Sequence, residues 1–371
     1  MYLTRLVFVA LLVFGGAKGQ NREGDSCLLQ KTGERGVCRV LGDCTEAIEG
    51  AVYYGIDVQV CGVLGGLEVV CCSPSSPPRS SCLRLPSSVV KVPRTLAKAG
   101  DYCINLTEKI YPCRETNHIW TRENYCPPVP DSADVHARTA TSSKEFPHLA
   151  RLGNGNANNI RWRCIGSLIS DRWVLTAVFC LTVPSPEVRF VGLGMGIAGI
   201  KGSAPRQVYT ISRRVLHPAF NRSHSGIHNN MALAQLDRVV TFSNQVLPAC
   251  LHTGTPLQNN GLILTRLDDG TDIYKWTMEK LSHAECSEKL PEDSWLIGGV
   301  QNATQICARP IDTGGSQCMD YGIGGPLQVY NGDRVACTYL LVGVGIYGPD
   351  CVALASRVAA FVPWIETVVW P

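Results

Sequence analysis

A short apolar run near residue 10 is framed by a basic residue and by small residues. Nine apolar residues, 6–14, follow Arg5, and Ala17 and Gly19 stand at the −3 and −1 positions of a cut after residue 19. A membrane-spanning helix needs about 20 apolar residues, so this run is too short to cross a bilayer. The pattern predicts a secretory signal peptide over residues 1–19 rather than a membrane anchor.

From about residue 135 onward, short β-rich runs alternate with Gly, Pro, Asn and Asp. Residues 167–177 read as two buried strands around a turn at 170–172. Asn331-Gly332-Asp333, flanked by Val329-Tyr330 and Arg334-Val335, is a hairpin signal, because Asn-Gly tolerates positive φ. A closing helix is predicted from apolar residues at helical spacing: Val358, Phe361, Val362, Ile365 and Val369. Many strands and one late helix predict an all-β barrel or sandwich.

Composition and charge exclude several classes of protein. Of the 371 residues, 45% are hydrophobic and 18% are charged, so the chain can bury a core and is not intrinsically disordered. The net charge of +3 does not indicate a nucleic-acid-binding surface, because such a surface needs clustered Lys and Arg. Neither nucleic acid nor a membrane is expected as a partner, and nothing in the sequence indicates a cofactor or a metal.

Cysteine is the strongest compositional signal. The chain has 18 cysteines, which indicates an oxidising, extracellular compartment. Residues 27–72 hold six of them in a block too small for a self-sufficient core, so three disulfides are expected there, with 15 connectivities open. Residues 73–134 are predicted to form a connector. Because this segment contains four cysteines, it should hold a local disulfide or a disulfide to a neighbouring domain. Sequons at Asn105, Asn221 and Asn302 predict N-glycosylation and fit a secreted route.

The six-cysteine block has a distinctive spacing. Its features are Cys27, the pair Cys38 and Cys44, Val60-Cys61-Gly62, and the closing Val69-Val70-Cys71-Cys72. These features resemble the clip domain of arthropod extracellular proteases, and another small disulfide module is the alternative. The resemblance implies the pairs Cys27–Cys71, Cys38–Cys61 and Cys44–Cys72.

Several landmarks occur in a fixed order along residues 135–371. They are Glu145-Phe146-Pro147, Cys164-Ile-Gly-Ser-Leu-Ile169, Trp173-Val-Leu-Thr-Ala177, Pro248-Ala249-Cys250-Leu251, Gly324-Gly325-Pro326-Leu327, and Arg357-Val358 with Trp364-Ile365. Together they resemble the chymotrypsin-like serine protease domain. That resemblance implies a double β-barrel with a C-terminal helix, preceded by the clip domain.

The three positions that the resemblance assigns to catalysis hold other residues. Phe179 in Leu175-Thr-Ala-Val-Phe-Cys180 stands where the family has its histidine. Asn230 replaces the aspartate, and Ile323 replaces the serine before Gly-Gly-Pro. The reaction needs a hydroxyl nucleophile, an imidazole base and an orienting carboxylate. The sequence therefore predicts a pseudoprotease that is not an enzyme. A relocated triad using His224, Ser225 and His228 is the weak alternative.

The surroundings of these positions depart from the family as well. Cys318-Met-Asp-Tyr-Gly-Ile-Gly-Gly-Pro326 carries one extra residue and places Tyr321 where an oxyanion-hole glycine is expected. Ser316 occupies the position that sets primary specificity, and Gly322 stands where the aspartate that pairs with the new N-terminus is expected. A defined specificity pocket and the usual zymogen switch are therefore not expected.

The resemblance also implies disulfides in the larger domain. The implied pairs are Cys164–Cys180, Cys286–Cys307, Cys318–Cys351 and Cys126–Cys250. Cys82, Cys103, Cys113 and Cys337 then remain, and their three possible pairings stay open.

The resemblance implies a non-catalytic cofactor or regulator of an innate immune cascade in arthropod haemolymph. Its expected partners are other clip-domain proteases or homologues, and prophenoloxidase (melanisation) or a complement-like thioester protein. The alternatives are an active protease of unusual mechanism and a microbial-surface or carbohydrate-binding protein that uses Trp120, Trp162 and Trp295. Arg94 and Arg138 are candidate cleavage sites, because both lie between the predicted domains.

Overall fold

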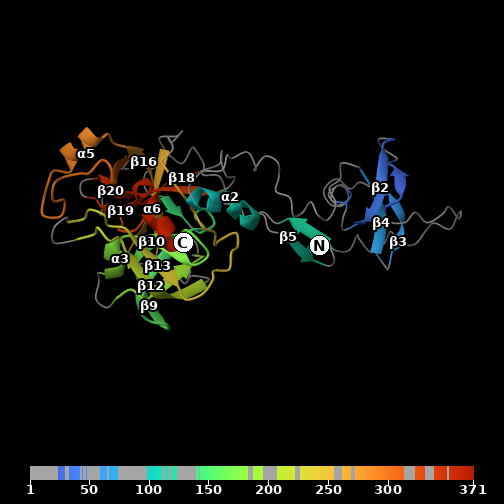
Figure 1. The fold of residues 1–371 in the computed structure, drawn as a ribbon, viewed down its shortest axis with the longest axis horizontal. Helices are drawn as coiled ribbons and strands as arrows, with labels where there is room; N and C mark the ends of the chain where they lie inside the picture. Colours follow the sequence, from blue (N-terminus) through green and yellow to red (C-terminus); the bar gives the residue numbers. More distant parts are fainter. Residues whose placement is uncertain are drawn as a thin grey trace. The chain divides into compact units, whose positions relative to one another are not determined.

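The computed structural model describes most of the chain after residue 23. It leaves out residues 1–23, 30–32, 42–43, 45–46, 48–58, 65–66, 74–97, 111–112, 117–118, 123–138, 142, 183–186, 195–206, 222–225, 255–260, 269–271, 313–321, 331–337 and 349–350. The described residues belong to two compact units (Figure 1). One unit holds strands β1 to β4 and the hairpin of β5 (Cys113–Thr116) and β6 (Ile119–Arg122), and the other holds helix α2 and everything from β7 onward.

The first unit is a small antiparallel sheet held by disulfides. Its strands are β1 (Ser26–Leu28), β2 (Arg35–Val40), β3 (Val60–Leu64) and β4 (Leu67–Cys72), in the order β1-β2-β4-β3. The disulfides are Cys27–Cys71, Cys38–Cys61 and Cys44–Cys72, the three pairs that the resemblance implies. Because Cys71 and Cys72 are adjacent, their side chains leave β4 on opposite faces and reach different partners.

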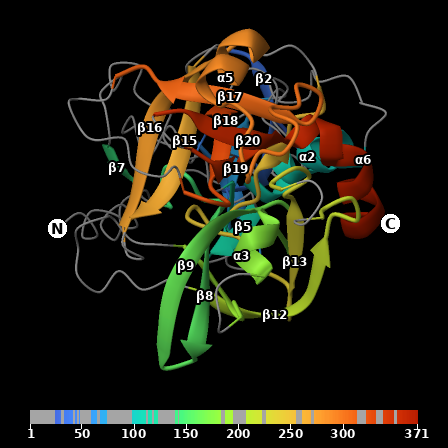
Figure 2. The same ribbon diagram turned by 90° about the vertical axis from the view of Figure 1, so that its left-hand side faces the viewer.

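The second unit contains two six-stranded barrels (Figure 2). The first closes in the order β10-β13-β12-β11-β8-β9. Its strands are β8 (Leu149–Asn156), β9 (Asn159–Leu168), β10 (Trp173–Thr176), β11 (Phe190–Leu193), β12 (Gln207–Leu216) and β13 (Ala232–Leu236). The two strands predicted within residues 167–177 are confirmed, since Leu168 pairs with Val174 across the turn.

The second barrel closes because β19 pairs with both β18 and β20. Its strands are β15 (Gly261–Asp268), β16 (Asp272–Lys280), β17 (Gln305–Pro310), β18 (Pro326–Tyr330), β19 (Tyr339–Tyr347) and β20 (Ala353–Arg357). Strands β7 (Thr139–Thr141) and β14 (Cys250–Leu251) add to β16 and β19. The predicted all-β double barrel is therefore confirmed. Strand β18 ends at Tyr330, which pairs with Tyr339 of β19. The predicted hairpin turn and its second run at residues 334–335 lie outside the described residues.

Besides α2, three helices flank the barrels in the described part of this unit. They are α3 (Val178–Thr182), α5 (His283–Lys289) and the closing α6 (Val358–Val369). The predicted helix at residues 358–369 is confirmed, and its predicted apolar residues are all buried. Disulfides Cys164–Cys180 and Cys286–Cys307 form as implied. Cys351 is disulfide-bonded, but its implied partner Cys318 lies outside the described residues.

Helix α2 (Lys98–Ile110) lies within the predicted connector yet packs on the protease-like unit, next to α6 (Figure 2). The backbone N–H of Ala99 donates to Oε1 of Glu366 over 2.9 Å, and the ammonium of Lys98 donates to the carbonyl oxygen of Trp370 over 2.7 Å. The rings of Tyr102 and Trp370 lie 5.0 Å apart. The predicted connector thus includes a docked element.

The implied pair Cys126–Cys250 is wrong, because Cys250 bonds to Cys103. Ala99, Cys103 and Leu106 are buried and lie at helical spacing, so one apolar face of α2 carries the cysteine onto β14. The predicted tie between the connector and a neighbouring domain is therefore present, through a cysteine that had been left unassigned. Cys126 itself lies outside the described residues.

The pairing of Cys103 with Cys250 can be tested directly. Peptide mapping without reduction should yield a linked peptide that contains both cysteines. Replacing both, as Cys103→Ala with Cys250→Ala, should lower the free energy of unfolding by about 3 kcal/mol, because the bond restricts the unfolded chain. A linked peptide joining Cys126 to Cys250 would contradict the assignment.

His148 is buried between aromatic rings at the edge of the first barrel. Its ring lies 6.2 Å from that of Phe146 and 5.5 Å from that of Tyr339, between ring centroids. Burial lowers the pKa of His148 to about 3, and interaction with the Gln328 side chain opposes that shift only in part. The folded protein therefore holds this imidazole neutral over a wide range of pH.

This burial predicts a specific pH dependence of stability. Below the ordinary histidine pKa of about 6.5, the unfolded state binds a proton that the folded state excludes, so the free energy of unfolding falls with pH. Between pH 7.5 and pH 5 the loss from His148 should be about 2 kcal/mol. Urea unfolding of the wild type and of His148→Gln at both pH values measures it. Equal pH dependence in the two proteins would refute the assignment.

Candidate functional site

The residues at the three catalytic positions of the resemblance come together where the two barrels meet. Antiparallel pairing of β10 with β13 brings Thr176 opposite Ala232, so the segments after β10 and before β13 lie side by side. Phe179 in α3 is thereby adjacent to Asn230, and its backbone N–H donates to Oδ1 of Asn230 over 3.3 Å. Asn230 is fully buried, and its carbonyl oxygen accepts from the hydroxyl of Ser356.

Ile323 is held against α3 by the residues beside it. The carbonyl oxygen of Ile323 lies 3.3 Å from Sγ of Cys180, the cysteine that follows Phe179. The next residue, Gly324, has a φ of +85°, and a Cβ there would collide with the carbonyl oxygen of Ile165. Glycine is therefore required at that turn. The side chain of Ile323 is 39% exposed, so it faces the solvent at the junction.

An aromatic cluster surrounds the ring of Phe179. Its ring meets those of Phe220 and Trp295 edge to face, at centroid distances of 5.7 Å and 6.4 Å. Trp295 is 44% exposed, whereas Phe179 is nearly buried. We call Phe179, Phe220, Trp295 and Ile323 the junction cluster. None of these four side chains can accept or donate a proton at a nucleophilic atom, because they are hydrocarbon apart from the indole N–H.

The loop that carries Trp295 is fixed by hydrogen bonds. A carboxylate oxygen of Asp293 accepts from the backbone N–H groups of Leu296 and Trp295, over 2.6 and 2.7 Å. These hydrogen bonds lower the pKa of Asp293 below its ordinary value, and the bond from Leu296 has the largest effect. The other carboxylate oxygen accepts from the Tyr347 hydroxyl over 3.2 Å. The exposed indole is thus held on a rigid loop, which reduces the entropy lost when it binds a partner.

The alternative catalytic residues are only partly described. The ring of His228 is buried, and its Nε2 lies 2.7 Å from the carbonyl oxygen of Ile297. His224 and Ser225 lie outside the described residues, as do Ser316, Tyr321, Arg94 and Arg138. Gly322 is described, and its carbonyl oxygen accepts from the backbone N–H of Gly325.

The sequons lie in different settings. Asn221 and Asn302 are exposed, while Asn105 lies on α2 and its side chain is not described. The sulfur atoms of Cys27, Cys38 and Cys61 lie within 4.8 Å of one another, but each already forms a disulfide and so offers no thiolate to a metal.

Sequence reasoning named Phe179, Asn230 and Ile323, which the structure brings to one junction, but it missed some of the side chains that surround them. Phe220 and Asp293 gave no local signal of proximity to Phe179, because they come from distant segments of the chain. Trp295 was named as a candidate for carbohydrate binding, but its contact with Phe179 was not foreseen. Within the described part of the chain, no helix is both long and apolar enough to cross a membrane.

Comparison with known proteins identifies relatives along most of the chain. The chain is 26% identical to the serine protease snk of Drosophila melanogaster over 367 residues, which cover 93% of this chain and 79% of that protein. It is 26% identical to CLIP domain-containing serine protease B4 of Anopheles gambiae over 61% of this chain and 68% of that protein. Phenoloxidase-activating factor 3 of Holotrichia diomphalia is 26% identical over 80% of this chain and 92% of its own length.

A family profile described as Trypsin matches residues 136–365, which is more than half of the chain and spans both barrels. The double barrel, the disulfide beside α3 and the geometry of the junction agree with that match. The chain therefore belongs to the trypsin family.

Proposed function

We propose that this protein is a secreted, non-catalytic member of the trypsin family that regulates an innate immune proteolytic cascade as a cofactor. The observation that carries the proposal is the chemistry of three side chains at the barrel junction. Phe179 has no basic nitrogen, Asn230 has no carboxylate, and Ile323 has no hydroxyl. Loss of one triad member lowers turnover by roughly 10⁴- to 10⁶-fold in active relatives, and here all three positions differ.

The contacts of these residues support a binding role. The amide of Asn230 accepts from the backbone of Phe179 and lies in the interior, where a carboxylate would orient an imidazole in an active enzyme. The Cys164–Cys180 disulfide lies beside the junction, and the ring of Phe179 packs against Phe220 and Trp295. An ordered apolar surface at this place favours recognition of a partner over simple decay of the fold.

The relatives support the place in a cascade. One of them is named as a factor that activates phenoloxidase and another as a clip-domain protease. The partners that we propose are other clip-domain proteases, and either prophenoloxidase in melanisation or a complement-like thioester protein in opsonisation. Secretion is supported by the predicted signal peptide and by six disulfides among the described residues.

A microbial-surface or carbohydrate-binding role is the second candidate. It is favoured by the exposure of Trp295, because sugars stack on exposed indole rings. Trp162 is half-buried, and the side chain of Trp120 is not described, so one tryptophan carries this candidate. Pull-down on bacteria or β-glucan, with and without haemolymph, separates the two: binding without haemolymph favours direct recognition.

The absence of catalysis is tested by chemistry at the junction. A fluorophosphonate probe should leave the protein unlabelled, and a peptide library should show no turnover, while an active clip-domain protease treated in parallel reacts with both. Labelling or turnover that disappears on a single substitution would revive a catalytic mechanism. Ser225→Ala and His228→Gln are the substitutions to use, because they remove the alternative nucleophile and base.

The binding role predicts that the junction cluster contacts the partner. Crosslinking mass spectrometry on immune-challenged haemolymph should link this protein to a clip-domain protease, to prophenoloxidase or to a thioester protein. Trp295→Ala should weaken that association at least tenfold, as central aromatic residues do at interfaces. Ile311→Ala is the matched control, because Ile311 is 48% exposed on another segment. Equal weakening by both variants, or none by Trp295→Ala, would place the interface elsewhere.

A further inference from the structure

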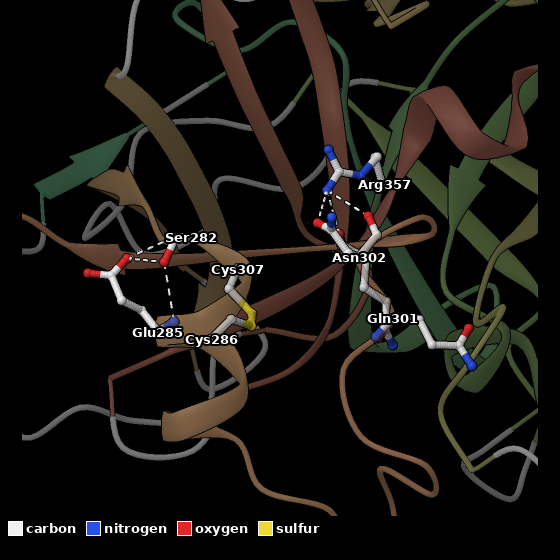
Figure 3. Close-up of a disulfide and its surroundings, with 8 residues drawn as sticks. Ser282, Glu285, Cys286, Gln301, Asn302, Cys307 and Arg357 are labelled. Atoms are coloured by element: carbon white, nitrogen blue, oxygen red, sulfur yellow. Dashed lines mark hydrogen bonds between the residues drawn. A yellow bond between two sulfur atoms is a disulfide. The ribbon is translucent and has the colours of Figure 1, made fainter.

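A cavity of about 140 Å³ lies beside α5, between β16, β17 and the end of β20. The Cys286–Cys307 disulfide forms part of its wall, and Figure 3 shows Arg357 and Asn302 on the other side of that bond from Ser282 and Glu285. The cavity is several times larger than the share of one water molecule in the liquid, about 30 Å³. It therefore has room for a small polyatomic ligand.

Arg357 brings a positive charge to this cavity that no carboxylate neutralises in the described part of the chain. Its Nη2 donates to the carbonyl oxygens of Asn302 and Gln305, over 3.0 and 2.8 Å. Its Nε is buried without a hydrogen-bond partner. Burial lowers the pKa of Arg357, which reflects the unfavourable environment of the charge. An anion beside Nε would accept its unused hydrogen bond and would also compensate the buried positive charge.

Gln305 supplies a second unpaired donor to the same cavity. Its Oε1 accepts from the backbone N–H of Gln301 over 2.7 Å, and this bond fixes which end of the amide is free. Nε2 has no partner, although the residue is only 2% exposed. A buried N–H without an acceptor is unfavourable, because the donor has lost its hydrogen bonds to water. Gln305 and Arg357 thus both line the cavity, and each keeps a buried side-chain donor without an acceptor.

The remaining charges near the cavity are consistent with an anionic ligand. Lys280 and His283 line it and are exposed, and no Asp or Glu lines it. The nearest acidic side chain of α5, Glu285, accepts from the backbone N–H and the hydroxyl of Ser282, over 2.9 and 2.7 Å. Figure 3 shows it turned toward Ser282 rather than toward Arg357.

We propose that this cavity binds a sulfate or phosphate group, either as the free ion or as an ester on a sugar. Nε2 of Gln305 and Nε of Arg357 donate to its oxygens, and Lys280 at the mouth adds a positive charge. Charge-assisted hydrogen bonds of this kind are the strong ones in proteins. The site is separate from the junction cluster and does not depend on whether the junction is catalytic.

Equilibrium dialysis of the full chain against radiolabelled sulfate, at constant ionic strength, tests the proposal. The wild type should bind one sulfate per chain at saturation. Gln305→Glu should lower the affinity at least tenfold, because it replaces a donor by a negative charge while an oxygen still accepts from Gln301. Lys280→Gln should weaken binding by a smaller factor. Lys289→Gln, which removes the same charge outside the cavity, should bind as the wild type does.

Competition identifies the source of the group. Displacement of the label by inorganic phosphate with no displacement by glucosamine 6-sulfate supports a free ion, and stronger displacement by the ester supports a sugar sulfate. Thermal unfolding of each variant checks that it is folded. If Gln305→Glu fails to fold, the sulfate affinities of Lys280→Gln and Lys289→Gln are compared instead, and weaker binding by Lys280→Gln alone supports the proposal. The proposal fails if the wild type shows no saturable binding, or if the cavity variants bind as tightly as the control.

Discussion

The pairing of β10 with β13 is the constraint on which the junction depends. It sets Phe179 beside Asn230, and the Cys164–Cys180 disulfide fixes the helix that follows β10. Gly324 completes the arrangement, because only glycine allows the turn that brings Ile323 against Cys180. The backbone of the junction is thus held by strand pairing, by a disulfide and by the steric fit at Gly324. Of the three side chains, that of Asn230 takes part, because its Oδ1 accepts from the backbone N–H of Phe179.

Two polar environments in the protease-like unit contrast with each other. At the junction, Asp293 and Tyr347 satisfy one another and the neighbouring backbone, and the exposed surface is hydrocarbon. In the cavity beside α5, Arg357 and Gln305 keep donors without acceptors. The first surface favours contact with apolar groups of a protein, whereas the second favours a compact anion. One domain therefore offers two separate recognition chemistries.

The sequence predicted the elements that have short-range signals. The strands at residues 167–177 and the helix at 358–369 follow from apolar spacing and turn residues. The three disulfides of the first unit were implied by the resemblance to the clip domain, because the cysteines alone leave 15 connectivities open. Helix α2 was missed, because the connector was read from its cysteines and prolines rather than from the buried face of Ala99, Cys103 and Leu106. The wrong pair Cys126–Cys250 has the same cause, because the docking of the apolar face of α2 on β14 brings Cys103 to Cys250. Phe220 and Trp295 reach Phe179 only through the folded barrels, and no local pattern reports such contacts.

The Cys103–Cys250 bond also bears on how the protein responds to proteolysis. It spans 147 positions of the chain, and Arg138 lies between its ends. Hydrolysis after Arg138 would therefore produce a heavy and a light fragment that still migrate together until a thiol reductant is added. Because α2 packs against α6, the amino-terminal fragment would stay bound to the barrels through these contacts as well as through the Cys103–Cys250 disulfide. A nick at this position would alter the connection between the domains without dispersing them.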